Sequence, residues 1–95
     1  METNGNILRI NIGSRSIDEY ILSIIVELNR GFRVIELRGT GDNICKVADV
    51  YVELKKRLGG AIKIIEGNTG TARSRSGRKN YMWIRIGYNP VGWEE

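Results

Sequence analysis

The 95-residue sequence predicts a two-layer α+β domain of order β-α-β-α-β-β, with two helices on one face of a four-stranded mixed sheet. Two segments repeat apolar residues at the spacing of one helix face, and four short runs are rich in β-branched residues. A basic segment, expected to form a long β-hairpin arm, joins the last two of these runs. Because typical domains contain about 100–150 residues, residues 1–95 are expected to form one domain.

The first half of the chain has the pattern of a strand, a helix and a second strand. Residues 7–12 (ILRINI) are mostly apolar, as expected of a strand inside a sheet. Ser16 and Glu19 have the S-x-x-E spacing of a helix capping box, and Gly31 supplies a left-handed stop. The run FRVIELRG at 32–39 is the next strand, so the order implies a right-handed parallel crossover. The apolar face of the helix comprises Ile17, Tyr20, Ile21, Ile24, Ile25 and Leu28.

A second helix is expected at about residues 43–58, after the glycine-rich turn Gly39-Thr40-Gly41. Asp42 or Asn43 can cap its start, and Gly59-Gly60 ends it. Cys45 has no base or second thiol to activate it, so it is expected to be a small buried residue. The buried face is predicted to comprise Ile44, Val47, Ala48, Tyr51, Leu54 and Leu58.

The basic arm is predicted at about residues 67–81, between the strand-like runs 61–66 and 81–88. It reads GNTGTARSRSGRKNY and has almost no apolar side chain that could join a core. Lys and Arg pair with phosphates, so a nucleic-acid backbone is the expected partner, whereas a solvated loop is the plain alternative. The cationic side chains of the arm are Arg73, Arg75, Arg78 and Lys79.

The net charge of +4 is concentrated toward the C-terminal end. Residues 67–95 hold five Lys and Arg against two Asp and Glu, whereas residues 1–66 hold ten against nine. With no histidine and one cysteine, the sequence argues against His-based catalysis and against a zinc site, so no cofactor or metal is expected. Without a run of about 18 apolar residues, no membrane partner is expected. The single thiol fits a reducing, cytoplasmic and chromosome-associated location.

Two strand-to-helix turns offer backbone N–H groups to an anion. One contains Ser14 and Arg15, and the other is the glycine-rich turn before the second helix. Since both follow parallel strands, they are expected to be neighbours, with Arg15, Arg38 and Lys46 forming a cationic patch at the base of the arm. A plain turn is the alternative for the second one, where the carboxylate of Asp42 opposes phosphate binding. Neither turn matches a nucleotide-binding P-loop.

Three segments of the chain carry a resemblance to known proteins: IGSRSI at 12–17, LNRG at 28–31 and, most specifically, LRGTGDNICKVAD at 37–49. In these segments the chain resembles the Alba family, small basic archaeal proteins that bind DNA in chromatin and also RNA. The resemblance covers about residues 7–88 and implies a fold similar to the C-terminal domain of bacterial translation initiation factor three. It also implies a homodimer, or a heterodimer with a paralogue, that presents a central body and two DNA-contacting arms.

The resemblance further implies which residues contact nucleic acid. Ser14-Arg15 stand where the family has a Lys-Lys pair, and Thr40 and Asp42 stand where members often have Arg. Lys46 matches its family counterpart, and Leu58 takes the place of a Phe that some members use between dimers. The arm is therefore expected to carry more of the binding. The implied nucleic-acid-binding residues are Ser14, Arg15, Arg38, Thr40, Asn43, Lys46, Arg73, Arg75, Arg78 and Lys79.

The sequence thus predicts a non-enzymatic chromatin protein that binds double-stranded DNA, with RNA as a further ligand, largely without sequence preference. The alternative is an RNA-binding protein of RNA processing or ribonucleoprotein assembly, because A-form RNA is also recognised by shape. A third interpretation is an enzyme or small-anion sensor that uses the Gly39–Gly41 turn. The lack of a paired nucleophile and base argues against it.

Overall fold

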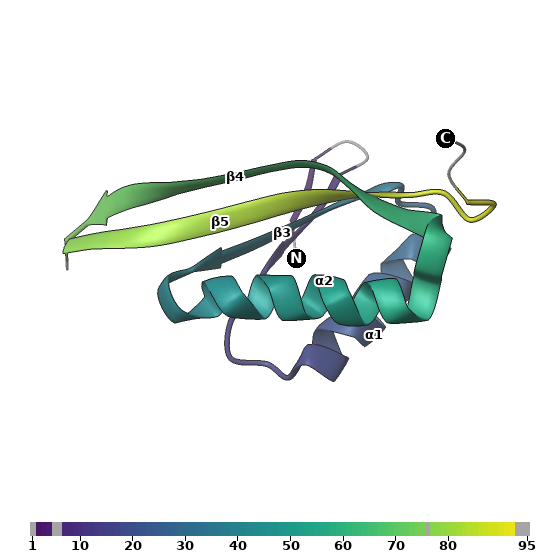
Figure 1. Ribbon diagram of the computed structural model, residues 1–95, viewed down its shortest axis with the longest axis horizontal. Helices are drawn as coiled ribbons and strands as arrows, with labels where there is room; N and C mark the ends of the chain where they lie inside the picture. The colour runs from purple at the N-terminus through teal and green to yellow at the C-terminus, as the bar shows by residue number, and fades with distance from the viewer. Residues whose placement is uncertain (1, 5–6, 76, 93–95) are drawn as a thin grey trace.

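Two helices cover one face of a mixed sheet in the computed structural model, which describes residues 2–4, 7–75 and 77–92 (Figure 1). The strand order is β1-β2-β3-β5-β4, with β2 and β3 parallel and the other neighbours antiparallel. This confirms the predicted two-layer α+β fold. The structure adds a short strand, β1 (Glu2–Asn4), to the expected order. The sequence did not predict it, because its polar residues lack the apolar alternation that marks a strand.

Each predicted helix and strand is present. The strands are β2 (Ile7–Asn11), β3 (Val34–Thr40), β4 (Ile62–Ser74) and β5 (Gly77–Tyr88). The helices are α1 (Ile17–Asn29) and α2 (Ile44–Leu58), and single 3₁₀ turns flank α2 at Gly41–Asn43 and Gly59–Ala61. Within the described part of the chain, neither helix has the length and apolar character needed to cross a membrane.

Helix α1 begins and ends at the predicted signals. The Ser16 hydroxyl oxygen accepts a hydrogen bond from the Glu19 backbone N–H at 3.2 Å, which satisfies one of the free donors of the first turn. The Glu19 carboxylate lies 3.4 Å from the same hydroxyl, whereas a full capping box would direct it to the Ser16 backbone N–H. Gly31 has a φ of +113°, a backbone conformation that residues with a Cβ rarely adopt, and it ends the helix as predicted.

The start of α2 differs from the prediction, because neither Asp42 nor Asn43 forms a side-chain cap. The 3₁₀ turn leads directly into the helix, and Asn43 already has near-helical backbone angles of φ −86° and ψ −3°. A capping side chain needs the extended backbone of an N-cap residue. The turn packs closely against β3, since a Cβ on Gly39 would lie 2.7 Å from the Asn43 carbonyl oxygen.

The buried face of α2 is also rotated slightly from the predicted one. Val50 is buried and Ala48 is exposed, so the face runs at 47, 50 and 54. Cys45 is exposed, which makes the expectation of a buried thiol wrong. Both corrections have the same cause, because α2 contacts the sheet through a narrow stripe and leaves its remaining sides to solvent.

The core lies between the helices and the sheet. The side chains of strand β5 alternate, with Ile86 buried and Met82 and Ile84 packed against the core, while Trp83 and Arg85 lie on the opposite, open face of the sheet. Among the described residues, the buried apolar side chains are Leu8, Ile10, Ile12, Tyr20, Ile21, Ile24, Leu28, Ile35, Leu37, Val47, Val50, Leu54, Ile62 and Ile86.

The predicted arm is a two-stranded extension of the sheet. β4 and β5 pair from Ile62 and Tyr88 at the core to Ser74 and Gly77 at the tip, and the hairpin projects beyond the N-terminal start of α2 (Figure 1). It gives the molecule its long dimension of 45 Å against 26 and 23 Å. The pairing contains one irregularity, a bulge at residue 65 on the core side of the arm.

Candidate nucleic-acid interface

The arm carries its cations on a tip with no core behind it. Arg73, Arg75, Arg78 and Lys79 are all exposed. Arg73 is the direct cross-strand partner of Arg78, and Lys79 follows opposite Ala72. Like charges directly opposite one another destabilise a strand pair, so the tip concentrates positive charge at the expense of its own stability. A polyanion placed against it would relieve that repulsion.

Tyr81 connects the arm to the body. It pairs across the hairpin with Gly70, where a Cβ would lie 2.6 Å from the Tyr81 hydroxyl oxygen, so the ring lies across the glycine. The guanidinium carbon of Arg38 is 5.7 Å from the centroid of the same ring, within cation–π range. This contact places Arg38 beside the base of the arm.

Lys46 joins the two strand-to-helix turns. Its ammonium group donates a hydrogen bond to the Gly13 carbonyl oxygen at 2.7 Å and lies 5.7 Å from the centroid of the Tyr20 ring. The Tyr20 hydroxyl in turn accepts a hydrogen bond from the Gly13 backbone N–H at 2.6 Å. The two turns are therefore neighbours in space, and Lys46 acts as a tie between them with its charge partly engaged.

The other predicted residues of the body lie around these contacts. Ser14 and Arg15 are exposed on the turn before α1, and Thr40 is exposed at the end of β3, opposite Tyr81. Asn43 is half-buried in the 3₁₀ turn before α2. The structure thus separates the predicted residues into a body group near the strand ends and a tip group at the far end of the arm.

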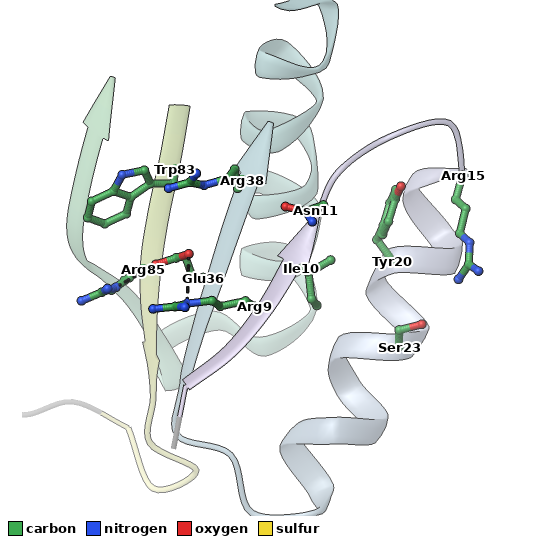
Figure 2. Close-up of a pocket in the computed structure, with 10 residues that line it drawn as sticks. All are labelled: Arg9, Ile10, Asn11, Arg15, Tyr20, Ser23, Glu36, Arg38, Trp83 and Arg85. Carbon is green, nitrogen blue, oxygen red and sulfur yellow. Dashed lines mark hydrogen bonds and ion pairs between the residues drawn. The ribbon is translucent and has the colours of Figure 1, made fainter. Parts of the chain in front are cut away.

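Arg15 and Arg38 line one groove of about 800 Å³. Figure 2 shows Arg15, Tyr20 and Ser23 along the α1 side of this groove and Arg38 on the sheet side. Sequence reasoning did not find most of its lining, because those residues lie far apart in the chain. The alternation of β5 was the available signal, since it placed Trp83 and Arg85 away from the core. The lining residues outside the predicted site are Arg9, Ile10, Asn11, Tyr20, Ser23, Glu36, Trp83 and Arg85.

A row of alternating charges crosses the open face of the sheet. Arg85 bonds to Glu36 through Nε and to Glu66 through Nη1, each at 3.0 Å. On the other side, Arg9 Nε lies 3.5 Å from the second carboxylate oxygen of Glu36. Glu36 is only 6% exposed, and the two guanidinium groups compensate the buried charge of its carboxylate. We call Arg9, Glu36, Arg85 and Glu66 the charge ladder; its charges sum to zero.

An apolar edge lies where α2 meets β4. Val52, Ile64 and Ile65 are each about half exposed, at 50%, 47% and 47%. Lys55, one turn beyond Val52, donates a hydrogen bond from its ammonium group to the Ile62 carbonyl oxygen at 2.7 Å. This contact places the helix flank beside β4, which is an outer strand of the sheet. The edge therefore combines partly exposed apolar side chains with an outer strand of the sheet.

A protein-family model described as Alba matches residues 9–71. Two archaeal relatives are both named DNA/RNA-binding protein Alba 2, one from Saccharolobus solfataricus and one from Saccharolobus shibatae. Each is 33% identical over 73 residues, which cover 77% of this chain and 82% of the relative. The matched range of the family model stops before the cationic tip of the arm, and it includes both turns of the body group.

Two solved structures have the same fold. Alba from Thermoplasma volcanium superposes with a TM-score of 0.71 at 20% identity, over 83% of this chain and 98% of that one. ALBA1 from Trypanosoma brucei superposes with a TM-score of 0.68 at 18% identity, over 92% of this chain and 72% of that one. At these identities the likeness establishes the fold.

Proposed function

Because the chain belongs to the Alba family, we propose that it is a non-enzymatic, chromosome-associated protein that binds double-stranded DNA, with RNA as a further ligand. The two Saccharolobus relatives are named DNA/RNA-binding proteins, which supports this class of ligand. Binding is largely independent of sequence in this proposal. Arginines on a hairpin contact phosphates and groove walls, which are present in every duplex.

The observation that carries the proposal is the isolated positive charge of the arm. Its four cations are exposed, and no carboxylate of a described residue lies within ion-pair distance of Arg73, Arg75, Arg78 or Lys79. The charge ladder and the helices, in contrast, contain compensated cations, as in the pair of Arg57 with Asp18. A phosphate backbone is the ligand that fits a projecting, uncompensated cationic hairpin.

The proposed binding unit is a homodimer in which a second copy covers the apolar edge. A two-fold interface uses the same patch on both subunits, and Val52, Ile64 and Ile65 supply apolar area for it. Two arms in one dimer can reach successive minor grooves about 34 Å apart. A paralogue with a similar edge would give a heterodimer. Sedimentation equilibrium should give twice 10.7 kDa, and Ile64→Asp should shift the mass toward the monomer.

The function is tested by binding assays on matched duplex DNA, duplex RNA and single strands at several salt concentrations. A variant with Arg73, Arg75 and Arg78 all changed to Ala is compared with the unmodified chain. Removing one arginine–phosphate interaction with a duplex lowers the slope of log affinity against log salt by about 0.9, so a decrease of about 2–3 units is expected for one arm. The matched control changes Arg30, Lys56 and Arg57 on the helices to Ala, which alters the net charge equally.

An arm variant with the affinity and salt slope of the unmodified chain would reduce the arm to a solvated loop and refute the proposal. A preference for duplex RNA at equal salt would favour the alternative of ribonucleoprotein assembly. Equal decreases of affinity in the arm variant and in the helix control would assign the effect to net charge, which also contradicts the proposed role of the arm.

A further inference from the structure

The groove on the open side of the sheet has a path that the arm does not explain. It begins beside α1 at Tyr20 and Ser23, crosses β2 at Ile10 and Asn11, and continues over the open face of the sheet (Figure 2). Strand β1 pairs with Ile7–Arg9 and ends before this crossing. The groove can therefore pass over the edge of β2, from the helix side to the open face, without meeting a neighbouring strand among the described residues.

The charges along this path divide into compensated and uncompensated ones. Arg9 and Arg85 both face the buried carboxylate of Glu36 and belong to the charge ladder. Arg15 and Arg38 have no carboxylate within ion-pair distance among the residues described. A neutral floor with an uncompensated arginine on each side suits a ligand that brings its own negative charges along an extended chain.

Trp83 provides an aromatic surface at the sheet end of the groove. It is half-buried on the open face and is the direct cross-strand partner of Arg38. The guanidinium carbon of Arg85 lies 5.1 Å from the centroid of the indole, and Glu36 and Glu66 fix that guanidinium in turn. The ring is thus supported from one side by an anchored cation, and its remaining exposed surface can take a flat ligand.

We propose that this groove binds a short single-stranded segment of nucleic acid, with an unpaired base stacked on Trp83 and the phosphates beside Arg38 and Arg15. Stacking on an aromatic ring next to a cationic track is how proteins hold single strands without a fixed sequence. A duplex cannot bind in this way, because its bases are already stacked between their neighbours. Asn11 and Ser23 offer hydrogen bonds to sugar or base edges along the path.

A second copy of the chain is the rival occupant of an open sheet face. A second copy closed over this groove would have to place carboxylates against both Arg15 and Arg38, because burying either arginine without an anionic partner is strongly unfavourable. A nucleic-acid strand supplies those partners with every phosphate. The inference rests on the proposed function for its class of ligand, nucleic acid. It adds a binding site separate from the arm, and that site takes unpaired strands.

Trp83 can report its own occupancy. The sequence has two tryptophans, and Trp93 lies outside the described residues, so a Trp93→Phe background leaves Trp83 as the single tryptophan fluorophore. Oligo-dT and oligo-U are titrated in parallel with a blunt duplex of the same length. We expect quenching of Trp83 by the single strands and little change with the duplex, since stacking requires an unpaired base.

Substitution of the ring then separates this site from the arm. Trp83→Leu should weaken single-strand binding about tenfold or more, while duplex affinity and its salt slope stay unchanged. Trp83→Phe keeps an aromatic ring and should retain most of the single-strand affinity. For the charges, Arg15→Ala should weaken single-strand binding, whereas Arg30→Ala, an exposed arginine on the far end of α1, should not. Circular dichroism checks that each variant is folded.

Unchanged single-strand affinity in Trp83→Leu would overturn the inference. So would a change of Trp83 fluorescence that follows protein concentration in the absence of oligonucleotide, because that result assigns the groove to a second copy. A chain that binds the blunt duplex and no single strand would overturn the inference and leave the proposed function standing. A chain that binds neither would overturn both.

Discussion

Arg73 of β4 and Arg78 of β5 stand directly opposite each other near the tip of the arm. In an antiparallel pair, opposed side chains project from the same face, so the two guanidinium groups repel across a few ångströms of exposed hairpin. The turn beyond them contains Arg75, which adds a third positive charge. The positive charges at the tip thus lower the stability of the hairpin. A bound phosphate would offset their repulsion and stabilise the hairpin.

Arg78→Glu should separate the stability of the arm from its binding. An opposite-charge pair with Arg73 is worth about 0.2–1 kcal/mol, so amide hydrogen exchange in the arm should slow by up to about fivefold. Duplex affinity should fall below that of Arg78→Gln, which removes the charge without reversing it. Faster exchange in Arg78→Glu, or affinity equal to the unmodified chain, would contradict the account of the tip.

Asp42→Arg should tighten duplex binding. Asp42 is exposed in the 3₁₀ turn before α2, beside the body group, and it makes no side-chain cap that the change would remove. Removing a negative charge and adding a phosphate contact should be worth about 1 kcal/mol at low salt, and less as salt rises. Binding isotherms at two salt concentrations measure this gain. Unchanged affinity in a folded variant would mean that this turn faces away from the nucleic acid.

Gly39→Ala should destabilise the fold. A Cβ there would lie 2.6 Å from a Val47 methyl carbon and 2.7 Å from the Asn43 carbonyl oxygen, and the backbone contact cannot move without shifting α2. Overpacking of this kind costs about 1–3 kcal/mol, to be measured by urea denaturation. Gly60→Ala is the matched control, because a Cβ at Gly60 meets no described atom within 4 Å. Similar destabilisation of both variants would show that the close approach is not the cause.

Glu36→Gln should weaken the fold through the charge ladder. The change leaves Arg9 and Arg85 facing each other without the buried carboxylate between them. A decrease in stability of about 2 kcal/mol is expected from hydrogen bonds to charged groups. Glu66→Gln should cost about 0.5 kcal/mol or less, since Glu66 is 53% exposed and its pair with Arg85 is screened by water. Thermal and urea unfolding of both variants measure the difference. Equal decreases in stability would show that the burial of Glu36 does not make its ion pairs more stabilising than the exposed pair of Glu66.

Local signals predicted the secondary structure because they act within a few residues of chain. The α1 helix depends on Ser16 at its start and on apolar residues one turn apart, and both can be read from the sequence. The absence of a side-chain cap at Asn43 could not be predicted from such local signals. The close packing of this turn against Gly39 in β3 accompanies its helical backbone, and that contact is set by the tertiary fold.

The candidate site was predictable where it is contiguous and hidden where it is assembled. The cations of the arm follow one another in a single segment. The ladder instead joins Arg9, Glu36 and Arg85 through the pairing of β2, β3 and β5, and no local pattern specifies that register. Trp83 could be assigned to the open face by alternation, but its neighbour Arg38 comes from another strand.

The bulge in β4 separates the arm from the core in one further respect. Ile64 pairs with Ile86 and Glu66 with Arg85, so β4 uses two residues where β5 uses one, and Ile65 is the extra residue. The alternation of side chains changes phase at this point. Residues can therefore be added or removed in pairs beyond the bulge while the pairing of the core half stays the same. The length of the arm can therefore change without a change in the fold of the core. Such a change would adapt the reach of the arm to nucleic-acid grooves of different depth.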